Sequence, residues 1–352
     1  MEVTLEPCWT GREQSTAAGL ILDYNPILRR SSPGFPRDRR FLIEWADKLK
    51  IGSTVIEDTF AEAFGMRYCR IIVTGHNRRW LEAAVHSFCG YGSSVIGCDA
   101  EVGAEQWLES SETPDGRIGV KILVFGFSSK AVQAALINRT GQCLMTCPTT
   151  AVFAGGKRED EDGVEPVERI PLGKHLRFFG DGYQKSKLIG DRRFWRIPVM
   201  DGEFLVEDAV EVRKGVAGGN LLILARDQNA GLASAERVVA ALDILAEVIT
   251  PFPGGVVRSG SKVGSRYPSL KASTADRYCP TLRGRVESDL PENVNCVYEI
   301  VVDGTSSEAV AEATRIGIEA AVGEGVVSIS AGNYGGKLGK HHFYLHDIMS
   351  SR

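Results

Sequence analysis

The stretch GVKILVFGFSSKAV, residues 119–132, decides the fold, because it returns 178 residues later as VYEIVVDGTSSEAV, residues 297–310. Each copy reads as an apolar strand, a glycine turn and a pair of serines that opens a helix. Serine is a favoured N-cap residue, so Ser128 and Ser306 are expected to cap these two helices. The stretch therefore predicts two copies of one structural unit.

Other segments repeat in the same order. IEDTFAEAFGMRYCRIIVTG from Ile56 matches VEDAVEVRKGVAGGNLLILA from Val206, and SSVIGCDAEVG ending at Gly103 matches GGVVRSGSKVG ending at Gly264. The spacing between copies grows from 150 to 161 to 178 residues along the chain. Longer loops in the second copy explain this growth, as expected after an ancient duplication.

Each copy predicts the order strand, helix, strand, strand, helix, strand. The predicted strands are 70–74, 93–97, 120–125 and 143–146 in the first copy and 220–225, 255–258, 297–302 and 326–330 in the second; helices are predicted at 79–88 and 233–247 and after the two serine pairs. This is the split ferredoxin-like unit. We predict an α+β fold, a tandem duplication of two ferredoxin-like lobes, with a proximal lobe at 50–197 and a distal lobe at 198–352.

Residues 1–49 differ from the rest of the chain. NPILRRSSPGFPRDRR, residues 25–40, combines prolines and arginines without apolar periodicity, which predicts a loosely ordered N-terminal extension. A basic docking segment and a start codon placed too early are the alternatives.

Composition favours a cytoplasmic globular protein. The 352 residues are 43% hydrophobic and carry a formal net charge of −4, without the basic excess typical of nucleic-acid binding. No apolar run is long enough to span a bilayer, and the first residues lack the apolar core of a secretory signal. Eight cysteines without a C-x-x-C pair are read as reduced core residues.

Glu299 is unusual because it lies in the middle of a strand that otherwise reads as buried. Alternation places it on the same face as Val297 and Val301, so either that face is solvated or the carboxyl group is held in a dry place. The matching residue in the first copy is Lys121. Periodicity alone favours a partly solvated face on which both long side chains reach water.

Glycine clusters are concentrated in the second copy. They are GVAGGN (215–220), PFPGG (251–255), SGSKVGS (259–265) and AGNYGGKLGK (331–340), with FFGDGY (178–183) in the first copy. Glycine lets the backbone approach a ligand closely, although tight turns are the simpler explanation. GVVRSGSK lacks the Gly-Lys-Ser/Thr order of a phosphate loop, and no dinucleotide-binding fingerprint follows a strand.

Other polar motifs favour ordinary surface or core positions. His341, His342 and His346 are interpreted as surface histidines, so no metal site is predicted. The charge run KREDEDGVE, residues 157–165, is expected to be a solvated loop. Cys143 and Cys147 are interpreted as core residues, because no histidine stands in a recognisable relation to them.

Several of these strings together resemble a known family. IEDTFAEAF, GQCLMT, FFGDGYQ, GVAGGN, PFPGG, SKVGS, CVYEI and SAGNYGGKLG are similar to segments of formylmethanofuran–tetrahydromethanopterin formyltransferases, from about residue 51 to residue 346. The resemblance implies two ferredoxin-like lobes and a homotetramer. It implies transfer of a formyl group between the primary amine of methanofuran and a ring nitrogen of tetrahydromethanopterin. Both carriers are substrates, so no bound cofactor is implied.

The resemblance also implies roles for particular residues. Glu299 lies in the string that matches the catalytic glutamate of the family and is expected to be the general acid and base. Asn220, Ser259, Ser261 and Lys262 are expected to orient the formyl group or bind carrier carboxylates. Asp181 and Tyr183 are expected to contact the pterin or to shape the cleft. The near-neutral net charge implies little need for salt, unlike strongly acidic thermophilic members of the family.

Two other functions stay open on the sequence. In bacteria the family resemblance extends to the formyltransferase subunit of a formyltransferase/hydrolase complex, where a catalytically silent scaffold with hydrolase subunits as partners is conceivable. A ferredoxin-like nucleic-acid binder is disfavoured by the net charge and by the absence of an aromatic strand motif.

Overall fold

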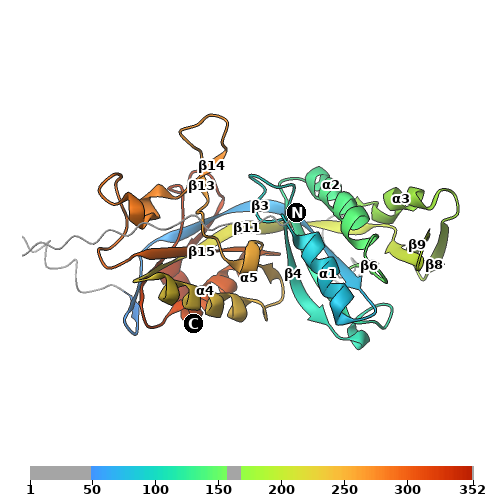
Figure 1. Ribbon diagram of the computed structural model, residues 1–352, viewed down its shortest axis with the longest axis horizontal. Coiled ribbons are helices and arrows are strands. Elements are labelled where there is room, and N and C mark those ends of the chain that lie inside the picture. Colours follow the sequence, from blue (N-terminus) through green and yellow to red (C-terminus); the bar gives the residue numbers. More distant parts are fainter. Residues whose placement is uncertain (1–48, 157–167, 351–352) are drawn as a thin grey trace, which may run out of the picture. The chain divides into compact units, whose positions relative to one another are not determined.

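The structure, a computed structural model, describes residues 49–156 and 168–350. It is a mixed α+β fold in which two similar sets of strands and helices follow one another (Figure 1). The first set is β3 (Phe60–Thr74), α1 (Arg78–Cys89), β4 (Glu101–Leu108), β5 (Gly119–Gly126), α2 (Ser129–Arg139) and β6 (Ala151–Ala154). The second is β11 (Val210–Ala225), α4 (Gln228–Leu242), β12 (Val248–Ile249), β15 (Cys296–Gly304), α5 (Ser307–Ala321) and β16 (Val326–Ser330).

The strand order is the same in both sets. Antiparallel pairing gives β4–β5–β3–β6 in the first and β12–β15–β11–β16 in the second. Ile72 pairs with Lys121 and Leu222 pairs with Glu299. The pairing register therefore follows the same offsets, 150 and 178 residues, that relate the two copies in the sequence.

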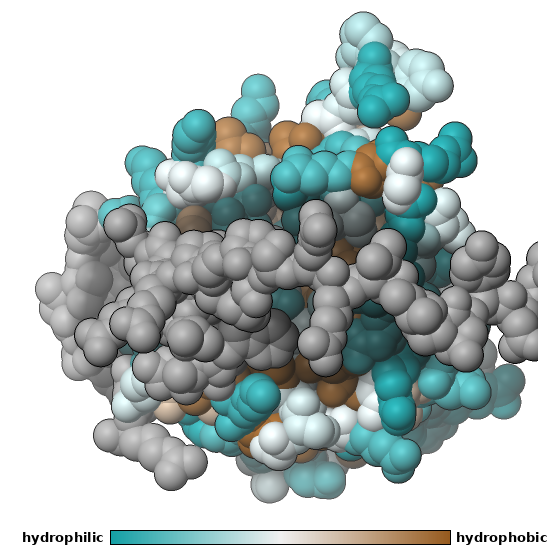
Figure 2. Space-filling model, turned by 90° about the vertical axis from the view of Figure 1, so that its left-hand side faces the viewer, coloured by the Kyte–Doolittle hydropathy of each residue, from teal (hydrophilic) through white to brown (hydrophobic). Residues whose placement is uncertain are grey.

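The remaining elements connect and extend these sets. They are β1 (Lys50–Ile51), β2 (Thr54–Ile56), β7 (Glu168–Ile170), α3 (Leu172–Leu176), β8 (Lys185–Ile189), β9 (Arg192–Val199), β10 (Gly202–Glu207), β13 (Lys262–Val263), β14 (Ala272–Ser273), β17 (His341–Tyr344) and α6 (Leu345–Ser350). The loop between β13 and β14 projects outward in Figures 1 and 2. On the uncovered part of the face in Figure 2, hydrophilic and hydrophobic residues alternate in small groups.

Two long strands join the two sets. Phe64–Cys69 of β3 pairs antiparallel with Val212–Ala217 of β11. The first half of β3 contributes Ala61 and Ala63 to the core under α4 and α5, and its second half contributes Ile71 and Val73 to the core under α1 and α2. β11 runs the opposite way, since Val210 belongs to the first core and Ile223 to the second. Both strands thus pass through both cores.

The predicted helix caps are confirmed. The hydroxyl of Ser128 accepts the N–H of Ala131 at 3.2 Å, and that of Ser306 accepts the N–H of Ala309 at 3.1 Å. The helix predicted at 233–247 begins earlier, because Asp227 caps α4 by accepting the N–H of Ala230.

Three predicted strands are wrong. Residues 255–258 end the short 3-10 turn Pro253–Gly255 and form one isolated bridge, between Val257 and Glu299, and the strand of that position is β12. Residues 93–97 form a turn in which the carbonyl of Ser94 accepts the N–H of Cys98 at 2.7 Å, and the strand of that position is β4. Residues 143–146 continue α2 through a wide π-type turn, where the N–H of Met145 reaches the carbonyl of Thr140, and the strand is β6. Short apolar runs do not separate turns or helix ends from strands, so local hydrogen bonds decided these cases.

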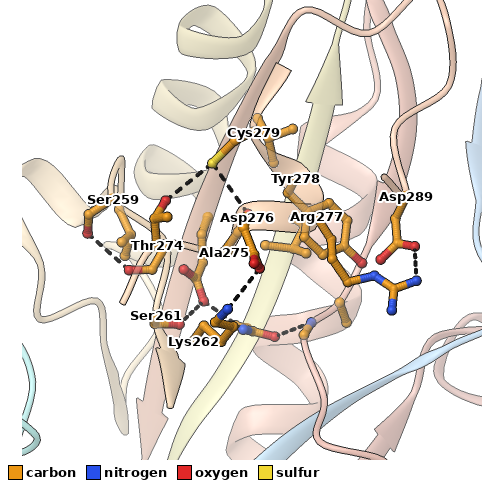
Figure 3. A pocket seen from close by; sticks show the side chains of 18 of the residues that line it. Ser259, Ser261, Lys262, Thr274, Ala275, Asp276, Arg277, Tyr278, Cys279 and Asp289 are labelled. Carbon is orange, nitrogen blue, oxygen red and sulfur yellow. Dashed lines mark hydrogen bonds and ion pairs between the residues drawn. The ribbon is translucent and has the colours of Figure 1, made fainter. Parts of the chain in front are cut away.

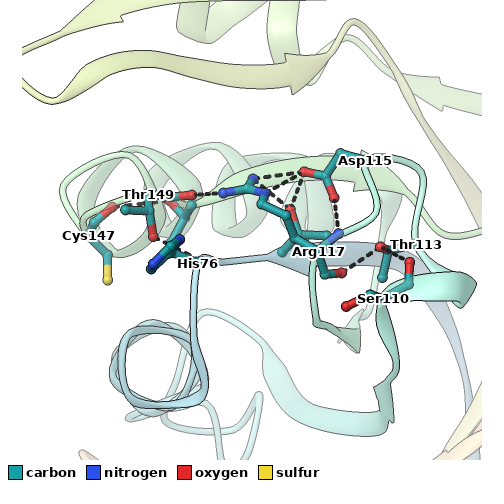
Figure 4. A network of polar contacts seen from close by, with 9 residues as sticks. His76, Ser110, Thr113, Asp115, Arg117, Cys147 and Thr149 are labelled. Atoms are coloured by element: carbon teal, nitrogen blue, oxygen red, sulfur yellow. Dashed lines mark hydrogen bonds and ion pairs between the residues drawn. The ribbon is translucent and has the colours of Figure 1, made fainter.

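A polar network fixes the loops at one end of the first set (Figure 4). The guanidinium of Arg117 donates to the carboxylate of Asp115 at 2.8 Å, to the hydroxyl of Thr74 at 2.9 Å and to the carbonyl of Thr149. Thr74 ends β3 and Thr149 precedes β6, so this network holds two strand ends in place.

The two faces of the second set are covered differently. Figure 1 shows α4 and α5 on one side of β11 and β15, and the segment that carries β13 and β14 on the other. On that other side, Leu222 and Leu224 of β11 contact Val294, Tyr278 and Leu290 of the long connection between β12 and β15. The long connection thus covers the face of the sheet that α4 and α5 leave open. It also encloses the cavity described next.

Candidate active site

Glu299 lies at the floor of a cavity of about 500 Å³ between β15 and the long connection. Its backbone pairs with Leu222 of β11 on one side and with Val257 on the other. Only 4% of the residue is exposed. The predicted alternation is confirmed: Ile300 and Val302 belong to the core under the helices, whereas Glu299 and Val297 line the cavity.

Two donors converge on one carboxyl oxygen of Glu299. The side-chain amide of Asn220 and the hydroxyl of Ser261 each donate to Oε1 at 2.7 Å. The amide of Asn220 is oriented by its own oxygen, which accepts the N–H of Gly332 at 2.8 Å. Because that oxygen already faces a backbone donor, the Asn220 nitrogen must point toward Glu299.

Ser261 is held by the other side of the cavity. Its carbonyl accepts the hydroxyl of Tyr334 at 2.9 Å, and it follows the turn at Gly260. Gly260 has φ +75°, and a Cβ there would lie 2.7 Å from the backbone nitrogen of Ala275. Only glycine fits this turn without displacing backbone, so the position of the Ser261 hydroxyl depends on it.

Burial raises the pKa of Glu299, and the hydrogen bonds from Ser261 and Asn220 oppose that rise without cancelling it. The ionised form is disfavoured because the surroundings cannot replace its hydration. A carboxyl group whose pKa is raised toward neutrality can give and take protons near physiological pH. The dry alternative for Glu299 is therefore correct, and the prediction of a solvated face is wrong for this residue.

The outer wall of the cavity is strongly polar (Figure 3). The ammonium of Lys262 contacts Asp276 at 2.9 Å and holds the pKa of that carboxyl group below its usual range. Arg277 pairs with Asp289 at 2.6 Å. Arg258 also lines the cavity. These side chains can meet charged or hydrogen-bonding parts of a ligand at the rim, above the buried carboxyl group of Glu299.

The structure brings together five of the seven residues expected at the site. Asn220, Ser259, Ser261, Lys262 and Glu299 all line the cavity, although the hydroxyl of Ser259 points to its neighbouring carbonyl at 3.0 Å.

The other two expected residues lie elsewhere. Asp181 and Tyr183 lie in an exposed turn between α3 and β8, where Asp181 adopts φ +48° and Tyr183 is 78% exposed. Neither lines the cavity, so their assignment to substrate binding stays a prediction.

Lys121 does not share the environment of its counterpart. Its ammonium donates to the side-chain oxygen of Gln106 at 2.9 Å on a half-buried sheet face. Two equivalent positions thus hold different chemistry, because the long connection covers only the second set.

The histidines near the C-terminus are engaged separately. The ring of His341 bonds Ser307 at 2.9 Å, that of His342 the carbonyl of Gly339 at 3.1 Å, and that of His346 the carbonyl of Ile56 at 2.8 Å. The charge run at 157–165 and the extension at 1–49 lie outside the described residues, apart from residue 49.

Sequence reasoning missed several residues of the site. The cavity is also lined by Thr59, Asp276, Arg277, Tyr278, Cys279, Asp289 and Tyr334. Tyr334 belongs to a glycine cluster that was noted, but nothing local indicates that its hydroxyl reaches Ser261. Residues 274–289 carry no motif, and only their length as a connection hints that they cover a sheet face.

A buried carboxyl group with fixed donors inside a polar cavity defines an enzyme site for acid–base chemistry. Family models agree with this class and make it specific. Residues 49–199 match the model described as formylmethanofuran-tetrahydromethanopterin formyltransferase, and residues 202–348 match the model described as FTR, proximal lobe. The chain belongs to the formylmethanofuran–tetrahydromethanopterin formyltransferase family. The second model calls the C-terminal half the proximal lobe, whereas our labels use proximal for 50–197 and distal for 198–352.

Relatives from bacteria and archaea are similar over most of the chain. A formylmethanofuran–tetrahydromethanopterin formyltransferase of Methylobacillus flagellatus is 50% identical over 304 residues, which cover 85% of this chain and 99% of that protein. The enzyme of the same name from Methanopyrus kandleri is 47% identical and covers 86% and 100%. A protein of Methylorubrum extorquens that is named as a subunit of the formyltransferase/hydrolase complex is 49% identical and covers 84% and 95%.

Two solved structures share the fold. The formyltransferase of Methanosarcina barkeri superimposes with a TM-score of 0.79 at 42% identity and covers 86% of this chain and 100% of its own. A chain of the formyltransferase/hydrolase complex of Methylorubrum extorquens, solved with methylofuran, gives 0.81 at 47% identity and covers 86% and 99%. The protein is thus an N-formyltransferase that acts with methanofuran and tetrahydromethanopterin as substrates.

Proposed function

We propose that Glu299 is the general acid and base of this formyl transfer. The observation that carries the proposal is the occupation of Oε1 by two donors, Asn220 and Ser261. An oxygen that accepts two hydrogen bonds does not carry the proton, so a neutral carboxyl group must carry it on Oε2. Oε2 has no partner among residues 49–156 and 168–350, and it is free to meet a substrate nitrogen.

The reaction balances with one proton donated and one recovered. The ring nitrogen of tetrahydromethanopterin attacks the formyl carbon, a C–N bond forms, and a tetrahedral oxyanion results. The C–N bond to methanofuran then breaks, and the leaving nitrogen takes the proton from Glu299. The proton lost by the attacking nitrogen restores the neutral carboxyl group. No covalent bond to the protein is required at either step.

The other residues of the cavity divide into two roles. Asn220 and Ser261 hold Glu299, and the turn 259–261 supplies backbone N–H groups near the place where the oxyanion develops. Lys262 and Ser259 at the rim bind polar or anionic parts of the carriers. Asp181 and Tyr183 are assigned to the pterin, as the family resemblance implies, away from the floor of the cavity.

The proposal extends to architecture and assembly. The repeated strand order and the matching register support two ferredoxin-like lobes that arose by tandem duplication, at about 50–197 and 198–352. We further propose a cytoplasmic homotetramer. No helix among the described residues is both long and apolar enough to cross a membrane. Hydrolase subunits are proposed partners, because a relative is named as a subunit of a formyltransferase/hydrolase complex.

A formyl-transfer assay on the purified chain tests the proposal. Formylmethanofuran and tetrahydromethanopterin are supplied, and formation of 5-formyltetrahydromethanopterin is followed for the unaltered protein and for Glu299→Gln. We expect turnover that collapses in the variant. Normal turnover of the variant would remove Glu299 from the mechanism, and inactivity of the unaltered chain would favour the scaffold alternative.

A further inference from the structure

Glu62 on β3 is a buried carboxylate held by backbone groups alone. The residue is 2% exposed and has no basic partner among the described residues. Its Oε2 accepts the N–H groups of Tyr334 at 2.6 Å and Gly336 at 2.9 Å, and its Oε1 accepts those of Leu338 at 2.7 Å and Gly339 at 2.6 Å. The loop after β16 therefore wraps around one side chain.

The loop has the glycines that such wrapping needs. Gly336 adopts φ +71°, which other residues rarely reach. At Gly339 a Cβ would lie 2.8 Å from the Cγ of Glu62, so any larger residue would displace the carboxylate or the loop. Burial would raise the pKa of Glu62, but the four backbone hydrogen bonds hold it below its usual range. The carboxylate thus stays ionised, the form that accepts N–H groups best.

The same loop holds both donors of Glu299. The N–H of Gly332 fixes the Asn220 amide at 2.8 Å, and the hydroxyl of Tyr334 fixes the carbonyl of Ser261 at 2.9 Å. The N–H of Tyr334 is itself bound by Glu62. The backbone of Glu62 also donates to the carbonyl of Gly332 at 3.2 Å. Glu62 is therefore linked to both donors of Glu299 through one residue each. Gly332 links it to Asn220, and Tyr334 links it to Ser261.

We propose that Glu62 is a positioning residue for formyl transfer, which locks the loop 331–340 so that Asn220 and Ser261 hold the carboxyl group of Glu299 in its productive orientation. The inference rests on the proposed role of Glu299. Glu62 touches neither the substrate cavity nor the reacting atoms, and it acts only through the loop. A side chain held by flexible residues would sample several orientations, and a misplacement of about 1 Å costs on the order of 10²-fold in rate.

Glu62→Gln is the informative variant. The amide keeps the size of the side chain but replaces one acceptor oxygen with a donor that faces two N–H groups. We expect kcat to fall by about tenfold to 10²-fold, with KM much less affected, since the loss concerns orientation. The alkaline limb of the pH–kcat profile should move to higher pH, because loosened Asn220 and Ser261 stabilise the ionised form of Glu299 less well. A merely structural role would lower stability without moving that limb.

Two companion variants sharpen the result. Glu105→Gln alters another buried carboxylate, which accepts Arg70 and the N–H of Glu247 far from the loop, and it should leave the limb in place. In an Asn220→Ala background, Glu62→Gln should move the limb less than in the unaltered protein, because one route of coupling is already lost. The inference would be overturned if Glu62→Gln changed neither kcat nor the alkaline limb of the pH–kcat profile. It would also be overturned if Glu62→Gln moved that limb as far in the Asn220→Ala background as in the unaltered protein.

Hydrogen exchange on the unaltered protein covers the case in which Glu62→Gln fails to fold. The amides of Tyr334, Gly336, Leu338 and Gly339 should exchange at least about tenfold more slowly than that of Lys337, whose N–H has no partner among the described residues. Equal exchange would refute a locked loop. The exchange result separates the two proposals: protected amides with an active Glu299→Gln would refute the proposed role of Glu299 and leave only a locked loop, whereas unprotected amides with an inactive Glu299→Gln would refute the role of Glu62 alone.

Discussion

Asn220 and Glu299 are diagonal neighbours on adjacent strands, joined by a hydrogen bond of 2.7 Å. Asn220 of β11 pairs with Val301 of β15, two residues beyond Glu299, so both side chains leave the sheet on the same face. Side chains at diagonal positions of an antiparallel pair are within reach of one another. The register of two strands thus places the donor on the carboxyl group.

Replacement of Glu299 by glutamine should reduce kcat by about 10²–10⁴-fold, the range that a positioned general acid and base contributes. Gln keeps the shape and can still accept from Asn220 and Ser261, so KM should change little. Steady-state kinetics of formyl transfer measure both constants. The matched control is Lys121→Gln, at the equivalent strand position outside the cavity, which should keep normal turnover. Similar losses in both variants would indicate damage to the sheet.

Replacement of Ser261 by alanine should shift the pH dependence in a defined direction. The hydroxyl of Ser261 stabilises the ionised form of Glu299, so its loss raises the pKa of that group further. A general acid works while protonated, and the alkaline limb of the pH–kcat profile should therefore move to higher pH. Ser259→Ala, in the same turn but bonded to Gly260, should leave the limb where it is. A shift to lower pH in Ser261→Ala would contradict the assignment.

Glu101 of β4 and Asp303 of β15 form a second buried carboxyl pair, and burial raises the pKa of both, with the charge of Glu101 adding to the rise at Asp303. Asp303 also accepts the N–H of Gly218 at 2.9 Å. A carboxyl group with a raised folded-state pKa binds its proton more tightly in the folded than in the unfolded state. Its contribution to stability is full below about pH 4, where an unfolded carboxyl titrates, and declines as the pH rises through the folded-state value.

Asp303→Asn should therefore lose less stability than the unaltered protein as the pH is raised from about 4 to 8. Thermal or denaturant unfolding over that range measures the slope. Glu308→Gln removes one negative charge at an exposed position and controls for net charge. An unchanged slope in Asp303→Asn would mean that the pair does not retain an extra proton in the folded state.

The two serine caps should make equal contributions to stability. Ser128→Ala and Ser306→Ala each remove one hydrogen bond to a first-turn N–H, which costs about 1 kcal/mol of the free energy of unfolding. Denaturant titrations of the two variants and of the exposed non-capping Ser110→Ala provide the comparison. A cost well above that range at one cap would point to a further role for that serine.

Parts of the fold with a local physical cause could be predicted from the sequence. The alternation in β15 and the caps at Ser128 and Ser306 depend on neighbouring residues alone, and they are confirmed. The turn at 93–97 and the wide helical turn at 140–144 could not be separated from strands, because a short apolar run suits all three. Their assignment depended on hydrogen bonds such as Met145 to Thr140, which the pattern of residue types does not reveal.

The site shows the same division. Glu299 stood out because a carboxyl group interrupts an apolar strand, and four of its expected neighbours line the same cavity. Its burial was missed, since the covering segment comes from a connection without periodicity. Glu62 was missed as well, because the loop that binds it lies more than 270 residues away in the chain. An acidic residue in a strand gives no sign of such a partner.

The passage of β3 and β11 through both cores bears on how the chain can be divided. A cut near residue 200 would leave the N-terminal fragment without Val210 and Val212 and the C-terminal fragment without Ile56, Ala61 and Ala63, all of them interior residues. Neither fragment would then retain a complete apolar interior, so each fragment expressed alone should be insoluble or lack fixed tertiary packing. In the intact protein, the two halves should unfold together in a single cooperative transition.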